Sequence, residues 1–129
     1  MAIKRYEDME AWKFAHKALL ATLNIIRTFP IDERFNLVSQ MRRAALSVPA
    51  NIVEGFGRWH PKEKIRFYNM SQSSLEELSY FYRVAKDVGY IKDDVEVRRV
   101  LDSTARMLKR LVQKTPYLPS YSQFRPRDS

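Results

Sequence analysis

Apolar side chains recur at steps of three and four residues in four stretches of this chain, which is the spacing of an amphipathic α-helix. Phe29-Pro30, His60-Pro61 and Gly89 separate the stretches. The residue before a proline is disfavoured in the α conformation, proline suits the first turn of a helix, and glycine commonly follows a helix C-terminus. Helices are therefore predicted over about 7–29, from a cap at Asp32 to the region of Arg58, over about 61–88, and from a cap at Asp93 or Asp94 to Lys114.

Four long helices with short connections predict an all-α protein, an antiparallel up-down four-helix bundle. At 129 residues, 45% of them hydrophobic, the chain is long enough for one domain with a buried core. Residues 1–114 are expected to form the bundle domain. The stretch 115–129 contains three prolines and no helical period, so it is predicted to be an extended Pro/aromatic tail unless its apolar residues dock: Tyr117, Leu118, Tyr121 and Phe124.

The stretch SVPANIVEGFGRW, residues 47–59, contains a proline and two of the three glycines, yet it keeps the helical pattern of the residues before it. Its apolar and polar residues stay on opposite sides of a helical wheel. The second helix is therefore predicted to continue through Pro49, although proline lacks the N–H that a helix interior uses. The apolar face contains Val38, Met41, Ala45, Val48, Ile52 and Phe56, and the polar stripe contains Asn36, Gln40, Arg43, Ser47, Asn51, Glu54 and Arg58.

This polar stripe is rich in amides and hydroxyls rather than in the lysines and glutamates of an ordinary solvated face. Short polar side chains are poor helix formers that make sense where each finds a designated partner. Arg43 and Glu54 are too far apart along the helix to meet, so they are expected to pair across helices or subunits. Gly55 and Gly57 lack side chains, so they allow close approach of another backbone or end the helix there. The stripe is interpreted as a polar seam that holds helices or subunits in register, and a ligand or RNA site is the alternative.

The predicted third helix has apolar residues on two flanks and only a narrow polar sector. The apolar arc spans on the order of 200°, about twice what a surface helix needs. A second partner surface, and hence a homo-oligomer, is predicted. Alternatively, the aromatic tail covers the second flank. One flank contains Ile65, Tyr68, Leu75, Leu78 and Tyr82, and the other contains Phe67, Met70, Phe81, Val84 and Val88.

The chain carries a net charge of +8, which permits an anionic partner such as nucleic acid. Four basic residues of the fourth helix fall within about 80° of one another, opposite its apolar face. They form either a solvated face or a stripe that contacts phosphates, with Asp102 at its edge. These residues are Arg99, Arg106, Arg110 and Lys114.

The sequence contains little that resembles catalytic or metal-binding chemistry. There is no cysteine, and His16 and His60 belong to neither an HExxH nor a Glu-x-x-His motif. No Walker loop, GxGxxG motif or readable Ser/His/acid set occurs. No enzyme activity, metal or cofactor is therefore expected. Neither a secretory signal nor an apolar stretch of about 18 residues is present, so a soluble, cytoplasmic protein without a membrane partner is expected.

The segment FPIDERFNLVSQMRRAALSVPANIVEGFGR, followed by SQSSLEEL, resembles the 23S rRNA intervening sequence protein family, also called the four-helix bundle protein family. The family is named for reading frames inside intervening sequences of bacterial 23S rRNA genes. The resemblance extends over roughly Met9 to Lys114. Val48-Pro49-Ala50 departs from the family pattern, which more often has Ile and a non-proline residue. The matching residues are Phe29, Pro30, Glu33, Leu37, Gln40, Arg42, Arg43, Ser47, Asn51, Ile52, Glu54, Gly55, Arg58, Ser74, Leu75, Glu77 and Leu78.

The resemblance implies an antiparallel four-helix bundle that assembles into a ring-shaped homopentamer, without known catalytic residues. It also implies a similarity in architecture to the accessory variability proteins of diversity-generating retroelements, which are basic pentamers that work with a reverse transcriptase and RNA. Two residues of the motif, Ser74 and Glu77, join the predicted polar seam. The seam then contains Gln40, Ser47, Asn51, Glu54, Gly55, Ser74 and Glu77.

The predicted function is that of a non-catalytic, basic, oligomeric bundle that binds RNA or a ribonucleoprotein through phosphate contacts. The alternative is a scaffold or adaptor that recruits a protein partner, such as a reverse transcriptase, without binding nucleic acid itself. The candidate phosphate-binding residues are Arg99, Arg106, Arg110 and Lys114, followed by Arg42, Arg43 and Arg58.

Overall fold

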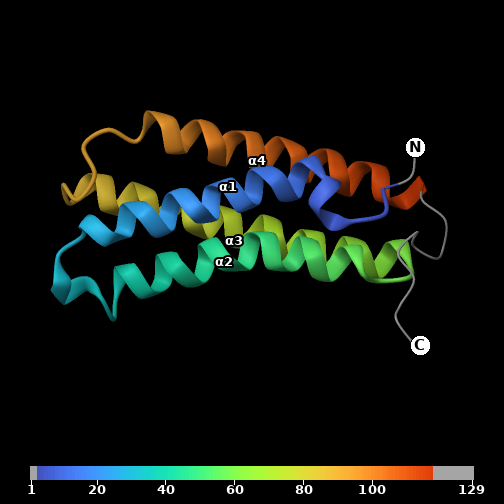
Figure 1. The fold of residues 1–129 in the computed structure, drawn as a ribbon, viewed down its shortest axis with the longest axis horizontal. Coiled ribbons are helices and arrows are strands. Elements are labelled where there is room, and N and C mark those ends of the chain that lie inside the picture. Colours follow the sequence, from blue (N-terminus) through green and yellow to red (C-terminus); the bar gives the residue numbers. More distant parts are fainter. Residues whose placement is uncertain (1–2, 118–129) are drawn as a thin grey trace.

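The computed structural model describes residues 3–117, and this part of the chain contains four α-helices and no strand (Figure 1). The prediction of an all-helical protein with four long helices is therefore confirmed. Four short 3-10 turns flank the helices, at Tyr6–Asp8, Ile26–Thr28, Ile31–Glu33 and Thr115–Tyr117. The helices are α1 (Glu10–Ile25), α2 (Leu37–Phe56), α3 (Pro61–Asp87) and α4 (Val95–Lys114).

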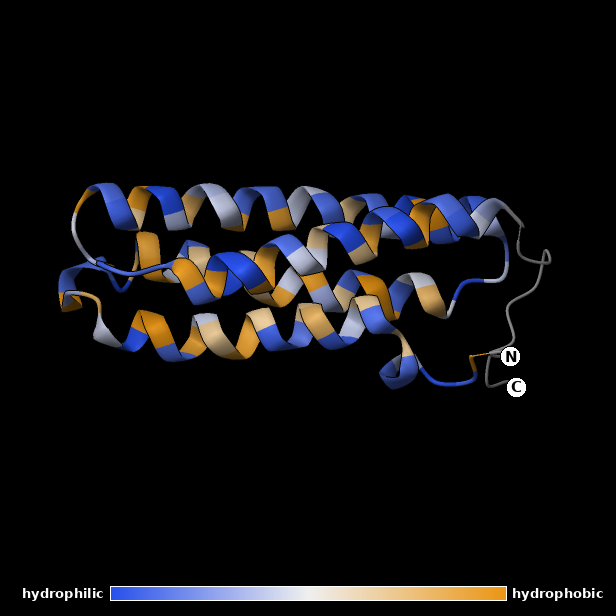
Figure 2. Cartoon of the chain, turned by 90° about the horizontal axis from the view of Figure 1, so that it is seen from above, coloured by the Kyte–Doolittle hydropathy of each residue, from blue (hydrophilic) through white to orange (hydrophobic). Residues whose placement is uncertain are grey.

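The helices lie side by side, and each packs against two others: α1 and α3 both contact α2 and α4. The α1–α2 and α3–α4 connections lie at one end of the molecule, whereas the α2–α3 connection and the C-terminus of α4 lie at the other (Figure 1). Hydrophobic and hydrophilic residues alternate along each helix in Figure 2, which is the pattern of amphipathic helices around a shared core. The most deeply buried apolar residues come from all four helices: Ala15, Met41, Ala44, Val48, Ile52, Leu78, Tyr82, Ala85 and Leu108.

One polar interaction crosses this core between α1 and α3. The Thr22 hydroxyl donates to the Ala18 carbonyl at 2.8 Å and lies 2.7 Å from the Tyr82 hydroxyl, so Tyr82 is the donor of the second bond. Both side chains are fully buried. Burial raises the pKa of Tyr82 to about 12, and the phenol therefore stays protonated as a donor at neutral pH.

The second helix continues through Pro49, as predicted. Its predicted apolar face is buried from Val38 to Ile52, with Phe56 half-buried. Ser71 of α3 donates to the Val48 carbonyl at 2.6 Å, so a neighbouring helix bonds the backbone beside the proline. The carbonyl that Pro49 leaves without a helical N–H partner is that of Ala45, so the Ser71 bond joins α2 to α3 beside the proline but does not replace the missing bond.

The predicted cap at Asp32 is wrong, because α2 begins only at Leu37, with Asn36 in the capping position. Asp32 lies in the 3-10 turn that precedes the helix. The Leu37 N–H instead points to the Glu33 carboxylate at 3.5 Å, and the other oxygen of that carboxylate accepts from the Tyr90 hydroxyl at 2.6 Å. Glu33 thus connects the start of α2 to the α3–α4 connection.

Both ends of α3 follow the prediction. Pro61 occupies the first turn, and Gly89 ends the helix with φ = +87°, a conformation that glycine adopts without strain. The Gly89 N–H bonds the Lys86 carbonyl at 3.1 Å, and the Tyr90 N–H bonds the Ala85 carbonyl at 2.8 Å. This pair of bonds is a Schellman motif, which satisfies carbonyls at the helix end.

The two apolar flanks of α3 have different environments. The first flank, which includes Tyr68, Leu75 and Tyr82, is buried in the core. On the second flank Met70 and Val88 are 45% and 56% exposed, and its remaining members are half-buried. The alternative in which the tail covers this flank involves Leu118, Tyr121 and Phe124, which lie outside the described residues.

Candidate nucleic-acid interface

The predicted basic stripe lies on the outer face of α4. The inner face is buried, and this fixes the rotation of the helix: Val97, Val100, Leu101, Thr104 and Leu108. At about 100° per residue, the stripe must then point away from the core. Its four members are exposed, and so is Lys109, which lies on the side of α4 that faces α3.

The charges of the stripe are concentrated in the second half of α4. Residues 103–114 contain four basic side chains and no acidic one. Within residues 3–117, none of these four cations has a carboxylate within ion-pairing distance, and Arg106 bonds only the Ser103 hydroxyl, at 3.1 Å. Arg99, in the first half, differs because it lies 3.4 Å from Glu96. The second half of α4 is therefore a cationic surface without internal neutralisation, formed by Arg106, Lys109, Arg110 and Lys114.

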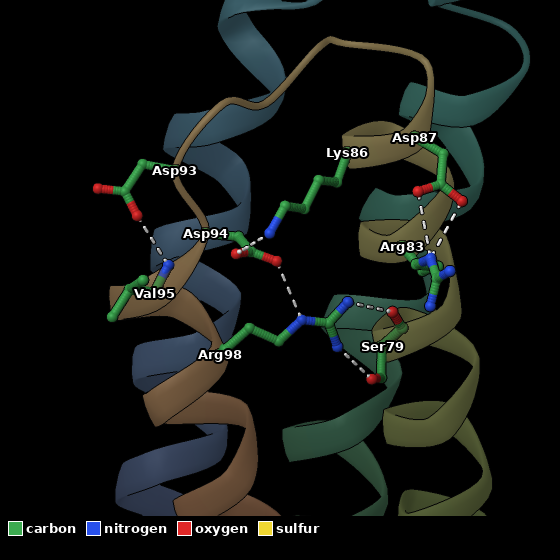
Figure 3. Close-up of polar contacts among 8 residues, drawn as sticks. All are labelled: Ser79, Arg83, Lys86, Asp87, Asp93, Asp94, Val95 and Arg98. Atoms are coloured by element: carbon green, nitrogen blue, oxygen red, sulfur yellow. Dashed lines mark hydrogen bonds and ion pairs between the residues drawn. The ribbon is translucent and has the colours of Figure 1, made fainter.

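Part of the charge at the other end of the molecule is neutralised internally. Residues 83–98 contain four basic and four acidic side chains. Figure 3 shows Asp94 between two cations: its carboxylate accepts from Lys86 at 3.1 Å and from Arg98 at 3.2 Å. Arg98 reaches on to the hydroxyl and carbonyl of Ser79, so it links α4 to α3.

The environment of Asp94 favours its charged form. The hydrogen bond from Lys86 lowers the pKa of this carboxyl, and the bond from Arg98 acts in the same direction. Asp94 is turned toward these cations, and Asp93 accepts the Val95 N–H at 3.0 Å. Of the two expected caps, Asp94 occupies the N-cap position without a side-chain capping bond, and the residue before it, Asp93, supplies the side-chain bond to the first turn of α4. The shallow groove beside this network, about 740 Å³, is lined by three acidic and three basic side chains.

The three further candidates for phosphate binding, Arg42, Arg43 and Arg58, differ in whether a carboxylate of the same chain already binds them. Arg42 is exposed on α2. Arg43 donates to Glu77 of α3 at 2.7 Å and also bonds Gln40. Arg58 pairs with Glu54 and lies over a phenylalanine ring. Arg43 and Arg58 are therefore already bound to carboxylates of the same chain. The cations in the second half of α4 are not, within residues 3–117.

The guanidinium of Arg58 contacts side chains of α2 and α3 in the same chain. It donates to Glu54 at 2.7 Å and lies over the Phe67 ring, 4.5 Å from the centroid. Its Nε atom is buried and has no hydrogen-bond partner among the described residues. Within the described chain Glu54 pairs along its own helix rather than across helices, because its partner lies one turn further along α2.

The remaining seam residues join α2 to α3. The Ser47 and Ser74 hydroxyls are 2.8 Å apart, and the Asn51 amide donates to the hydroxyl and the carbonyl of Ser47, both at 2.9 Å. These side chains are half-buried between the two helices. Together with the Arg43–Glu77 pair, they form a row of polar bonds along one helix–helix contact.

Gly55 and Lys64 lie at one end of the contact between α2 and α3. A Cβ atom at Gly55 would lie 2.6 Å from Cε1 of Tyr68, so only glycine permits the observed spacing. The Lys64 ammonium donates to the Phe56 carbonyl at 2.8 Å and to the Gly55 carbonyl at 3.3 Å, at the C-terminus of α2. Burial lowers the pKa of Lys64 to about 8. Burial of Lys64 is not among the predictions from the sequence, although this residue lies four positions before Tyr68 and therefore on the apolar side of α3.

Within residues 3–117, no group of three or more His, Cys, Asp or Glu side chains is placed to hold a metal ion. None of the helices in this range has the length and hydropathy needed to cross a membrane.

These features define a class: a basic, all-helical protein of four packed helices with an uncompensated cationic surface on its last helix. A family model described as 23S rRNA-intervening sequence protein matches residues 7–113. The chain therefore belongs to the 23S rRNA-intervening sequence protein family, as the resemblance in its sequence indicated. A search of curated proteins found no match.

Proposed function

We propose that this protein is a non-catalytic RNA-binding protein of the bacterial cytoplasm, and that it binds RNA or a ribonucleoprotein through the second half of α4. The observation that carries the proposal is that Arg106, Lys109, Arg110 and Lys114 lie close together on one helix without an acidic partner within residues 3–117, whereas Lys86 and Arg98 at the opposite end are paired. A polyanion supplies the missing negative charge and releases its counterions on binding. Such contacts position a nucleic acid without reading its sequence.

The proposal includes assembly. An antiparallel up-down bundle that forms a homo-oligomeric ring, a pentamer as the family resemblance implies, repeats the cationic surface on every subunit. Exposed apolar side chains on adjacent helices support a subunit contact: Leu46 of α2 is 55% exposed, and Met70 and Val88 of α3 are similarly open. Light scattering of the purified protein measures this directly, and a monomer of about 15 kDa contradicts assembly.

A salt titration with a structured RNA tests the binding. Each phosphate contact contributes a slope of about −0.7 to −0.9 in log K against log salt, so four cations per subunit predict a slope near −3 per subunit. The variant Arg106→Glu/Arg110→Glu should weaken binding strongly and flatten the slope. The matched control is Arg27→Glu/Lys92→Glu, which changes the net charge equally at exposed positions at the other end of the molecule.

The salt titration and the two charge-reversal variants distinguish binding at α4 from a general effect of net charge. Loss of binding in the α4 variant alone, with the oligomer intact, supports the proposal. No binding at about 50 mM salt, or binding that does not weaken as salt rises, contradicts it. An equal loss in both variants contradicts the location on α4, because it shows a dependence on net charge only.

The second candidate function is a scaffold or adaptor that recruits a protein partner, such as a reverse transcriptase, without contacting nucleic acid. The observation that favours it is the exposure of two large apolar side chains before α2, Ile31 at 77% and Phe35 at 80%. Phe35→Ser should then abolish capture of the partner while RNA binding and oligomer mass are unchanged. RNA binding by the unmodified protein alone argues against this function.

A further inference from the structure

The α1–α2 connection carries the two most exposed large apolar side chains of residues 3–117. Ile31 is 77% and Phe35 is 80% exposed, although side chains of these types are among those most often buried. Phe35 keeps this exposure even with the Arg34 guanidinium over its ring, 4.9 Å from the centroid. Single apolar side chains on a surface need no explanation, but two such side chains within five residues favour a contact surface.

Hydrogen bonds and packing fix the connection that carries these side chains. The Asn36 N–H bonds the Glu33 carbonyl at 3.0 Å. The Glu33 carboxylate accepts from the Tyr90 hydroxyl at 2.6 Å, which ties the α1–α2 connection to the α3–α4 connection. The Phe29 ring is buried, with its centroid 5.3 Å from that of Tyr90. Because little conformational freedom remains to be lost on binding, the exposed side chains are preorganised for a partner.

The charge of this connection is balanced. Residues 26–36 contain two basic and two acidic side chains, whereas residues 103–114 contain four basic and no acidic ones. Asp32 and Arg34 are exposed, and neither forms an ion pair within residues 3–117. A purely acidic or purely basic partner would leave one of these two charges uncompensated. A second copy of the chain offers both signs, so that Asp32 of one copy can pair with Arg34 of the other.

We propose that two copies of this protein meet head to head at their α1–α2 connections, with Ile31 and Phe35 of each copy packed against the other. A contact around a two-fold axis brings the same surface of both copies together, so that surface must be complementary to itself. The balanced charge of the connection meets this requirement in a chain whose net charge of +8 otherwise opposes self-association. The contact is small, but the subunits of an oligomer repeat it, and several weak contacts act together.

This contact goes beyond the proposed function, because it joins copies at the ends of their helices rather than along their sides. The C-terminus of α4 lies at the opposite end of the molecule from the α1–α2 connection (Figure 1). Two copies joined head to head therefore carry the second halves of their α4 helices toward opposite ends of the assembly. Such an assembly brings two RNA segments together, and this consequence, unlike the contact itself, rests on the proposed function.

Mass measured by sedimentation or light scattering tests the contact in the absence of RNA. The unmodified protein should have twice the mass of Ile31→Ser/Phe35→Ser at the same concentration, whatever oligomer the sides of the helices form. Asp32→Arg alone and Arg34→Asp alone place like charges opposite each other, so each should also halve the mass. The combined variant Asp32→Arg/Arg34→Asp exchanges the two charges on both copies and should restore the full mass. The control is Lys4→Asp, a charge reversal at an exposed position near the N-terminus, which should keep the full mass.

Two results overturn the inference. Full mass in Ile31→Ser/Phe35→Ser, or in both single reversals, shows that no second copy occupies the surface, which is then free for a foreign protein as the second candidate function requires. Half mass in the charge-exchanged variant excludes a second copy as the partner, because only another copy of the same chain carries the exchanged charges. Neither result affects RNA binding by α4, which the salt titration tests separately. The charge variants decide the question even if Ile31→Ser/Phe35→Ser does not fold, as judged by circular dichroism.

Discussion

Replacing Gly55 by alanine should destabilise the protein, although alanine is the better helix former. The added Cβ would lie 2.6 Å and 2.9 Å from two ring carbons of Tyr68 and 3.2 Å from the carbonyl oxygen of Lys64. Carbon atoms in contact are normally about 3.5–4.0 Å apart. The ring is only 2% exposed and cannot turn away, and the carbonyl belongs to the first turns of α3. Helices α2 and α3 must therefore separate at this point.

The size of the effect follows from two opposing terms. Overpacking of a filled site costs about 1–3 kcal/mol, and the upper part of that range applies because both a buried ring and a main-chain atom are too close. Alanine regains up to about 1 kcal/mol of helix propensity, and less near the helix end. Gly55→Ala should therefore lower the free energy of unfolding by about 2 kcal/mol. Urea denaturation followed by circular dichroism, at one fixed protein concentration, measures this loss.

A double-mutant cycle isolates the contact with Tyr68. In a Tyr68→Leu background the two ring carbons are gone, so Gly55→Ala should change stability by less than about 0.5 kcal/mol or increase it. In a Tyr68→Phe background both ring carbons remain, and the full loss should persist. An equal loss in all three backgrounds, or a gain in the unmodified protein, would refute the steric argument.

Three further predictions concern charge and backbone conformation. Because the folded chain releases the Lys64 proton near pH 8 and the unfolded chain near pH 10.5, the free energy of unfolding should rise between pH 8 and 10, by up to about 1.4 kcal/mol per pH unit. This rise in the free energy of unfolding should be absent in Lys64→Met. Above pH 10 the free energy of unfolding should fall, since Tyr82 keeps its proton to about pH 12 only when the chain is folded. Urea midpoints measured from pH 7 to 11 follow both effects. Gly89→Ala should cost about 1 kcal/mol through its positive φ alone, because a Cβ there meets no atom within 4 Å, and Gly89→Asn should cost less in the same assay. Arg110→Glu replaces two like-charge neighbours one turn away by two ion pairs, so it should stabilise the protein by about 1 kcal/mol while weakening RNA binding, and a loss of stability would contradict this account.

The helices and their buried faces could be predicted because they depend on local periodicity. The course of α2 through Pro49 is one example: the phase of its apolar face is the same before and after the proline, and the structure keeps one helix. The glycine at position 89 likewise predicts a helix end, because few other residues adopt a positive φ. The start of α2 could not be placed from local signals, because the bond from Leu37 to Glu33 is fixed by Tyr90, far along the chain.

The pairing of charges could not be predicted from the sequence, because it depends on which neighbouring helix a side chain faces. Arg98 and Arg99 are adjacent, yet Arg98 lies between α4 and α3 and bonds Asp94 and Ser79, whereas Arg99 points outward. A count of basic residues treats the two alike. The same holds for Arg43, whose acidic partner belongs to α3.

The unpaired cations of α4 also have an explanation that involves no ligand, and it accounts for only part of them. A basic side chain near a helix C-terminus is stabilised by the helix dipole, and this effect falls off within the last turn. Lys114 lies in that turn and needs no further reason to be basic. Arg106 and Lys109 lie further from the helix end and gain nothing from the dipole. Lys109 has no acidic residue one turn away, and Arg106 forms no ion pair within residues 3–117, although Asp102 lies one turn before it. The case for a polyanion therefore depends most on these two residues, and neutralising them is a sharper test of RNA binding than neutralising Lys114.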